Sequence, residues 1–310
     1  MQQSISPNEL FEQAIEFPDA DMRERFDALV GLDEVKTRMT KMLGLLVNTH
    51  GLAQWAKKYH SGASRIIPIV TRRPPLIVLA GDVGAGKSEL AYTIGDAVAR
   101  QQEIDVTLLP LSLATRGEGR VGQMTQLISA AFDYTIERAK KLQGSGGNSH
   151  GAVILLVDEA DALAQSRESG QMHHEDKAGV NAFIRGIDRL GNGRLPAAVI
   201  MCTNRPNSLD PAIRRRAAEI FHFGRPNEEQ RKAVLDGTLR ELGLSIKEIQ
   251  TIVETTGPGN KNEPGFTFSD LTQRLLPAIV LDAYPNHSVS GKQAIAIAKQ
   301  ISATPTFKES

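Results

Sequence analysis

The stretch GDVGAGKS at residues 81–88 constrains the fold of this chain more than any other feature. Its glycines let the backbone turn tightly enough to aim N–H groups at phosphate oxygens, and a helix beginning there adds its positive dipole end. The pattern G-x-x-x-x-G-K-[ST] carries this meaning only between a strand and a helix, which is where it stands here. The segment therefore predicts a phosphate-binding loop of an α/β fold, and not a plain glycine-rich turn.

The residues of this loop have separate expected roles. Lys87 is expected to reach the β- and γ-phosphates of a nucleoside triphosphate, and Ser88 to ligate Mg²⁺. The other expected nucleotide contacts are Gly81, Asp82, Val83, Gly84, Ala85, Gly86 and Glu89. ATP and Mg²⁺ are therefore the expected cofactors.

Two further apolar runs end in polar residues. The run at 151–157 leads into Asp158, expected to hold Mg²⁺ through water, and Glu159, expected to polarise the attacking water. The run at 196–202 leads to Asn204, which could hydrogen-bond the γ-phosphate or the water. Carboxylates also cap helices, and asparagine also forms turns. Downstream of a phosphate-binding loop, however, these residues predict a triphosphatase that hydrolyses its nucleotide.

Strand and helix patterns alternate along the first two thirds of the chain and then stop. Short apolar runs separated by helical patterns predict a parallel sheet covered by helices on both faces, and only helical patterns follow. The expected parts are a polar tail at 1–20, a large α/β domain at 21–226, a small all-helical lid at 227–303 and a tail at 304–310.

The charge balance and the cysteine count exclude several classes of protein. The 36 Lys and Arg residues match 36 Asp and Glu residues, so no global positive field attracts nucleic acid or an anionic membrane. The single cysteine, Cys202, excludes an intramolecular disulfide, and no run reaches the length of a membrane span. His173 and His174 lack the spacing of a zinc protease motif. A cytoplasmic protein is expected, with neither membrane nor nucleic acid as a partner.

Several segments together resemble the AAA+ ATPases, over about residues 25–285. FDALVGLDEVK is similar to the family segment in which a Val-Gly turn, here Val30 and Gly31, cups adenine. GDVGAGKS and ILLVDEAD match the Walker A and Walker B motifs, and MCTNRPNSLDPAIRR resembles the second region of homology, with Asn204 as the first sensor. The resemblance implies an α/β fold, with a P-loop AAA+ module that has a parallel five-stranded sheet between helices, followed by a small all-helical lid domain.

The same resemblance gives a role to one arginine of the triplet at 214–216. Counting from Asp210, the family register places the arginine finger on Arg215, whereas a narrower comparison places it on Arg216. Such a finger neutralises charge at the γ-phosphate of a neighbouring subunit, so the resemblance implies a homohexameric ring. The alternative for the triplet is a solvated face without chemistry.

A narrower resemblance is to the meiotic pachytene-checkpoint remodellers, carried by residues 159–190 and by LDPAIRRRAAEIFHFGRP. Those enzymes unfold part of HORMA-domain proteins, and bacterial relatives in CBASS antiviral operons dissociate the HORMA protein that activates a cyclic-oligonucleotide synthase. The resemblance implies an ATP-driven remodeller with a HORMA-domain partner. The alternatives are a DNA-linked helicase or clamp loader, another AAA+ unfoldase, and a nucleotide-binding scaffold that does not hydrolyse.

The sequence departs from these families in two places. No sensor-two arginine stands at the expected position in GFTFSDL, although Arg274 is nearby. The loop at 114–124 lacks the aromatic residue with which translocating relatives grip a substrate. The candidates for substrate contact in that loop are Arg116, Glu118, Arg120 and Val121, and an ordinary solvated loop is the alternative.

Overall fold

The computed structural model describes residues 7–60, 62–63, 65–112, 123–144, 149–164, 174–207, 209–259 and 263–306. The chain divides into two compact units. The α/β unit comprises Met1–Asp27, Glu34–Ala80 and Ser88–His222. The helical unit comprises Ala28–Asp33, Gly81–Lys87 and Phe223–Ser310, so it contains the phosphate-binding loop as well as the C-terminal helices.

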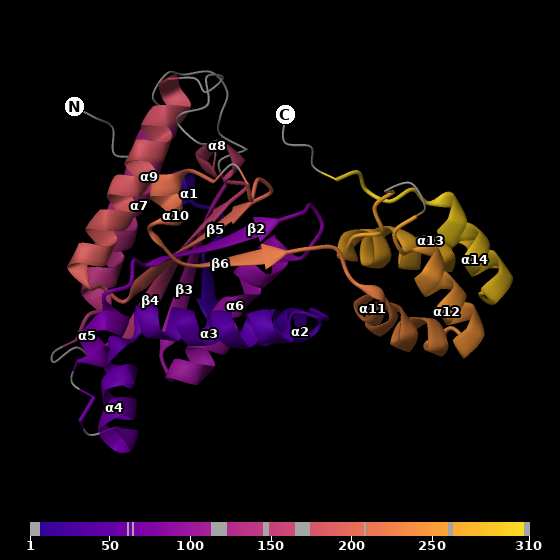
Figure 1. The fold of residues 1–310 in the computed structure, drawn as a ribbon, viewed down its shortest axis with the longest axis horizontal. Helices are drawn as coiled ribbons and strands as arrows, with labels where there is room; N and C mark the ends of the chain where they lie inside the picture. The colour runs from indigo at the N-terminus through magenta and orange to yellow at the C-terminus, as the bar shows by residue number, and fades with distance from the viewer. Residues whose placement is uncertain are drawn as a thin grey trace. The chain divides into compact units, whose positions relative to one another are not determined.

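The strands form one sheet in the order β1-β3-β4-β5-β2-β6 (Figure 1). Their bounds are β1 (Ile15–Phe17), β2 (Leu76–Gly81), β3 (Asp105–Ser112), β4 (Gly151–Asp158), β5 (Ala197–Thr203) and β6 (Ala217–Phe223). The pairs β3–β4, β4–β5 and β2–β5 are parallel. All residues of β2 and β5 are buried, as expected for strands covered on both faces.

The fold class is confirmed, but the sheet has six strands where the resemblance implies five. The edge strand β1 lies within the expected polar tail at 1–20 and pairs antiparallel with β3, from Ile15↔Leu108 to Phe17↔Val106. The Phe17 side chain is 3% exposed and anchors this strand. A strand of three residues is too short to show an alternating pattern, so the sequence gives no sign of it.

Helices cover both faces of this sheet: α7 and α9 lie on one face, and α3 and α6 on the other (Figure 1). Phe132 of α7 and Phe183 of α9 meet edge to face, with ring centroids 5.7 Å apart, in the buried core. The helices up to β6 are α1 (Pro7–Leu10), α2 (Ala20–Asp27), α3 (Asp33–Val47), α4 (Thr49–Tyr59), α5 (Ile66–Thr71), α6 (Lys87–Gln102), α7 (Gln123–Leu142), α8 (Asp161–Ala164), α9 (His174–Gly193) and α10 (Pro211–Arg214). Across the described ranges, no helix combines the length and apolarity needed to cross a membrane.

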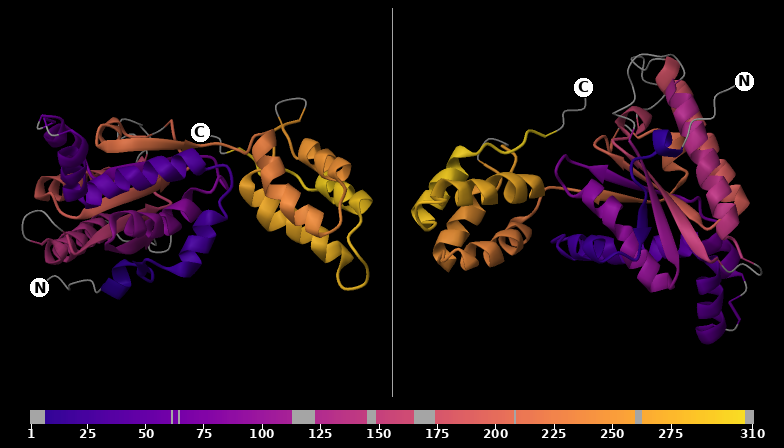
Figure 2. Two further views of the ribbon diagram at one scale, coloured as in Figure 1. Left: turned by 90° about the horizontal axis from the view of Figure 1, so that it is seen from below. Right: turned by 180° about the vertical axis from the view of Figure 1, so that it is seen from behind.

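The C-terminal helices pack around an apolar core of their own (Figure 2). They are α11 (Glu228–Glu241), α12 (Ile246–Thr255), the π-helical segment Asp270–Leu275, α13 (Leu276–Ala283) and α14 (Gly291–Gln300). Capping boxes at Asn227 and Ser245 fix where α11 and α12 begin, because each satisfies backbone N–H groups that the helix leaves unpaired.

Asp270 is the centre of the polar contacts in the helical unit. Its side chain is 1% exposed and accepts hydrogen bonds from the backbone N–H groups of Thr267 and Thr304, at 2.9 and 3.0 Å. The Thr304 hydroxyl and Arg274 Nη1 donate to the other carboxylate oxygen, at 2.7 and 2.6 Å. Burial raises the pKa of Asp270, but these hydrogen bonds outweigh it and bring the pKa to about 2.

Asp270 therefore makes the stability of the helical unit depend on pH in the acidic range. Its depressed pKa stabilises the folded chain by about 2 kcal/mol above about pH 4, and this contribution is lost as the pH falls through about 2. We predict that Asp270→Asn lowers the free energy of unfolding at neutral pH and flattens its pH dependence below about pH 4. Urea denaturation followed by circular dichroism measures both.

Asp282→Asn, which alters an exposed carboxylate of α13, is the matched control and should leave the acid dependence as it is. An Asp270→Asn protein that loses stability in acid as steeply as the parent contradicts the prediction.

Candidate nucleotide-binding site

The loop between β2 and α6 has the tight backbone that phosphate binding requires. Gly81 and Gly84 have φ values of 154° and 69°, in the region that glycine adopts without steric cost. A Cβ at Gly81 would collide with the carbonyl of Phe223, and one at Gly84 would lie 2.8 Å from Thr267 Oγ1. Both positions thus require glycine, and the loop fits a phosphate cradle.

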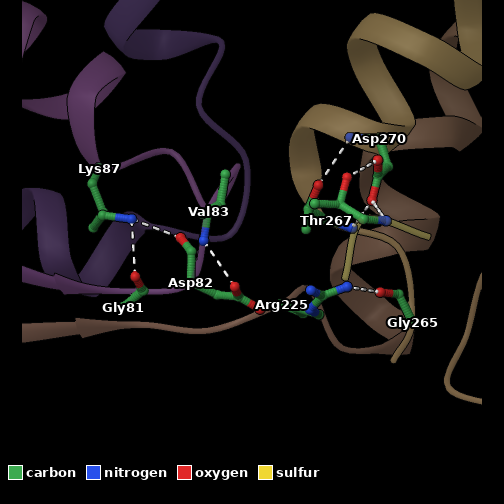
Figure 3. Close-up of polar contacts among 9 residues, drawn as sticks. Gly81, Asp82, Val83, Lys87, Arg225, Gly265, Thr267 and Asp270 are labelled. Carbon is green, nitrogen blue, oxygen red and sulfur yellow. Dashed lines mark hydrogen bonds and ion pairs between the residues drawn. The ribbon is translucent and has the colours of Figure 1, made fainter. Parts of the chain in front are cut away.

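The Lys87 side chain lies over this loop (Figure 3). Its Nζ donates to the carbonyl oxygens of Gly81 and Asp82, at 3.1 and 2.6 Å, and the residue is 6% exposed. The loop therefore holds a positive charge among the backbone groups that would face a phosphate.

The predicted adenine segment lies in the same unit as the loop. Gly31 has φ 73°, and its carbonyl oxygen accepts a hydrogen bond of 2.9 Å from Nε2 of Gln230 at the start of α11. The side chains of Leu29 and Leu32, which flank the Val30–Gly31 pair, lie within 4 Å of the position that a Cβ on Gly86 would take. The segment therefore joins the phosphate-binding loop to α11 through apolar contacts and one hydrogen bond.

In the α/β unit, the two predicted Mg²⁺ ligands are hydrogen-bonded to each other. Ser88 Oγ, in the first turn of α6, donates to Asp158 Oδ1 at the end of β4, at 3.1 Å. The backbone N–H of Glu159 donates to the same oxygen at 2.9 Å. A hydroxyl and a carboxylate are hard oxygen donors, so this pair fits Mg²⁺, which binds few protein ligands and keeps several waters.

Glu159 has an uncommon backbone conformation for a residue with a long side chain. Its φ is 51°, in the left-handed region, which costs on the order of 1 kcal/mol for such a residue. The side chain is exposed, directly beyond the carboxyl end of β4. The surrounding sheet therefore holds a strained glutamate at the edge where α/β folds bind ligands.

Asn204 is held by a residue that the sequence analysis did not single out, Asp161. The Asp161 carboxylate accepts from the backbone N–H and the Nδ2 of Asn204, at 2.7 and 3.1 Å, and from the Thr203 hydroxyl at 2.8 Å. The sequence signal that could have identified Asp161 is its place as an acidic residue three positions after Asp158, at the start of α8. Asp161 fixes the direction of the Asn204 amide at the end of β5.

The three neighbouring arginines have different surroundings. Arg216 binds Asp188 with two hydrogen bonds, of 2.7 and 2.9 Å, and this contact raises the pKa of Arg216. Arg214 donates to the carbonyl of Pro206 at 3.4 Å. The Arg215 side chain is exposed and makes no hydrogen bond or ion pair within the described ranges. Arg215 can thus reach another molecule without giving up a side-chain contact within these ranges.

Two predicted candidates are engaged elsewhere. The Glu89 carboxylate accepts from Arg25 Nε and Nη2, at 2.7 and 2.9 Å, so its side chain is committed to α2. Arg274 donates to Asp270 and to the Ser302 carbonyl, inside the helical unit.

The side chains of the other candidate residues named in the sequence analysis cannot be placed in the structure. Arg116, Glu118, Arg120, Val121 and His173 lie outside the described residues. His174 begins α9, but its side chain belongs to the part that is not described. Within the described part of the chain, no group of three or more His, Cys, Asp or Glu residues could hold a metal.

Residues 77–225 match the ATPase family associated with various cellular activities (AAA). Over 302 residues the chain is 63% identical to CD-NTase-associated protein 6 of Escherichia coli strain MS 115-1, which covers 97% of both chains. The protein of the same name from Escherichia coli strain KTE188 is 34% identical, over 98% of this chain and 99% of that one. This chain belongs to the AAA family of ATPases.

Solved structures agree with this family. One chain of the E. coli MS115-1 HORMA:CdnC:Trip13 complex matches this AAA ATPase with a TM-score of 0.91 and 62% identity, over 98% of this chain and 99% of that one. Rhizobiales Trip13 matches with a TM-score of 0.74 and 56% identity, over 95% and 99%. These matches confirm the predicted family and the narrower resemblance to the bacterial HORMA-directed remodellers, and the family supports ATP binding and hydrolysis. The roles of individual residues stay predictions.

The contacts of Asp161 give a test of the site. We predict that Asp161→Ala lowers kcat for ATP hydrolysis about tenfold or more and leaves KM for ATP within about threefold, because Asn204 loses its orienting acceptor but the phosphate-binding loop is unchanged. Steady-state ATPase assays measure both constants.

Asp133→Ala, which removes the 2.7 Å surface pair with Arg189, is the control and should change neither constant. An unchanged kcat in Asp161→Ala, or an equal loss in the control, would show that Asp161 has no part in hydrolysis.

Proposed function

We propose that this chain is a cytoplasmic, Mg²⁺-dependent ATPase that assembles as a homohexamer and remodels a HORMA-domain protein in CBASS antiviral defence. The observation that carries the proposal is the 63% identity to CD-NTase-associated protein 6 over 97% of both chains. The matching chain of the HORMA:CdnC:Trip13 complex supports a partner of the HORMA class in complex with a cyclic-oligonucleotide synthase.

In this proposal the residues of the loop bind and orient ATP. Val30 and Gly31 receive the adenine, the backbone N–H groups of residues 84–88 face the phosphates, and Lys87 neutralises the β- and γ-phosphates. Ser88 and Asp158 hold Mg²⁺, which supplies charge neutralisation at the phosphates when bound.

The groups at the ends of β4 and β5 act on the attacking water. Glu159 accepts a hydrogen bond from the water and takes its proton as the water oxygen bonds to the γ-phosphorus and the bond from that phosphorus to the ADP oxygen breaks. Asn204, whose amide is fixed by Asp161, orients the same water or the γ-phosphate. The exposure of Glu159 is what allows its carboxylate to reach a bound water.

We assign the finger to Arg215 and not to Arg216. The two hydrogen bonds between Arg216 and Asp188 occupy its guanidinium within one chain, and breaking them to reach a neighbouring subunit costs free energy. Arg215 is exposed and can extend without losing such a contact. For the substrate side, we keep Arg116, Glu118, Arg120 and Val121 as the contacts proposed from the sequence.

Glu159→Gln tests the proposed reaction and the partner together. The amide cannot accept the proton, so hydrolysis should fall about a hundredfold or more while ATP stays bound. We predict that this variant retains a HORMA-domain protein in an ATP-dependent pull-down from extract, and that the retained HORMA–synthase complex stimulates the ATPase of the parent protein. Stimulation by DNA, with no HORMA-domain protein retained, would contradict the proposal and favour the DNA-linked class.

Mixing subunits tests the finger. We predict that Arg215→Ala lowers hydrolysis about a thousandfold and that mixing it with Glu159→Gln restores part of the activity. In a mixed ring, an intact Glu159 of one subunit can meet an intact Arg215 of its neighbour. Arg214→Ala is the matched control and should hydrolyse ATP as the parent does. Absence of recovery in rings shown to be mixed would mean that Arg215 does not act between subunits.

A further inference from the structure

The phosphate-binding loop contains a carboxylate, which is an unfavourable group for a site that binds anions. Asp82 occupies the second position of the loop, and its side chain is 17% exposed. Its Oδ1 accepts a hydrogen bond of 2.9 Å from the backbone N–H of Val83, so the charge is fixed within the loop. A fixed negative charge at this place repels bound phosphates unless a cation neutralises it.

Arg225 is the cation that contacts this carboxylate (Figure 3). Its Nε donates to Asp82 Oδ2 at 2.7 Å, and its side chain is 13% exposed. Nη1 donates to the carbonyl of Gly265 at 2.6 Å. Since both charged groups are largely shielded from water, the pair interacts more strongly than an exposed one.

Backbone contacts on both sides of Arg225 hold it beside the loop. The N–H of Asp82 donates to the carbonyl of Phe223 at 3.1 Å, two residues before Arg225. The N–H of Ser269 donates to the carbonyl of Gly84 at 3.1 Å, four residues after the Gly265 that Arg225 contacts. The arginine is therefore built into the segments that bracket the phosphate-binding loop.

We propose that Arg225 is a positioning residue of the nucleotide site that neutralises Asp82, so that the positive charge of Lys87 is left for the phosphates of ATP. The proposal rests on ATP binding at residues 81–88. Without Arg225, the negative charge of the Asp82 carboxylate would offset the positive charge of Lys87. The two residues are close, because Lys87 Nζ donates a hydrogen bond to the backbone carbonyl of Asp82. Arg274 cannot take over this task, because Asp270 and the Ser302 carbonyl hold it.

Charge neutralisation makes a prediction that a purely structural role does not make. Removing Arg225 should weaken ATP binding, and removing the charge of Asp82 as well should restore it. A guanidinium needed only as a link between Asp82 and Gly265 would give no such rescue, because the double variant still lacks that link.

The experiment measures the Kd of Mg²⁺-ATP by calorimetry, in the Glu159→Gln protein and without any partner protein. We expect Arg225→Ala to raise Kd about tenfold, and Asp82→Asn/Arg225→Ala to bring it back within about threefold of the parent. Arg225→Lys keeps the charge and should stay within about threefold. Arg240→Ala, which removes the 2.8 Å pair with Asp236 on α11, is the matched control and should leave Kd unchanged.

Circular dichroism separates misfolding from weak binding. If Arg225→Ala does not fold, a folded double variant that binds ATP supports the proposal, and an unfolded one overturns it. A double variant as weak as Arg225→Ala, or an unchanged Kd in Arg225→Ala, also overturns it and leaves the nucleotide site intact. A parent protein that binds no ATP would overturn the proposed function together with this inference.

Discussion

The parallel pairing of β2, β4 and β5 is the constraint on which the site in the α/β unit depends. Parallel strands run in one direction, so the residues that follow them meet at a single edge of the sheet. The register Val157↔Met201 brings the end of β4 beside β5, and Ala80↔Thr203 aligns the ends of β2 and β5. The buried strands supply the packing that keeps a strained, exposed Glu159 in place.

The parts of the site that could be predicted from the sequence are those made by contiguous residues. The loop at 81–88 and the pair at 158–159 are recognisable because their chemistry needs adjacent groups at fixed spacing. The contacts that orient these groups join distant residues. Asp161 and Asn204 are 43 positions apart, and Asp82 and Arg225 are 143 positions apart. No local pattern marks such pairs, so only the fold reveals them.

The arginines show the same limit for a single residue type. In the sequence, Arg215 is the first candidate for the finger and the adjacent Arg216 is the second. Their surroundings in the structure differ, because Asp188, which lies 28 positions before Arg216 on α9, binds two nitrogens of the Arg216 guanidinium. The edge strand β1 could not be predicted from the sequence for a different reason. Its stability comes from pairing with β3 and from one buried phenylalanine, Phe17.

One side chain joins the start of a helix to the predicted adenine segment. Gln230 completes the capping box of α11 through its Oε1, which accepts from the backbone N–H of Asn227, and donates from Nε2 to Gly31. Glutamate completes a capping box equally well but has no N–H to give. Replacing Gln230 with glutamate would keep the capping box of α11 and remove the hydrogen bond to Gly31. The amide at position 230 therefore specifies a tertiary contact as well as the start of a helix, although the sequence pattern around it is that of a local helix cap.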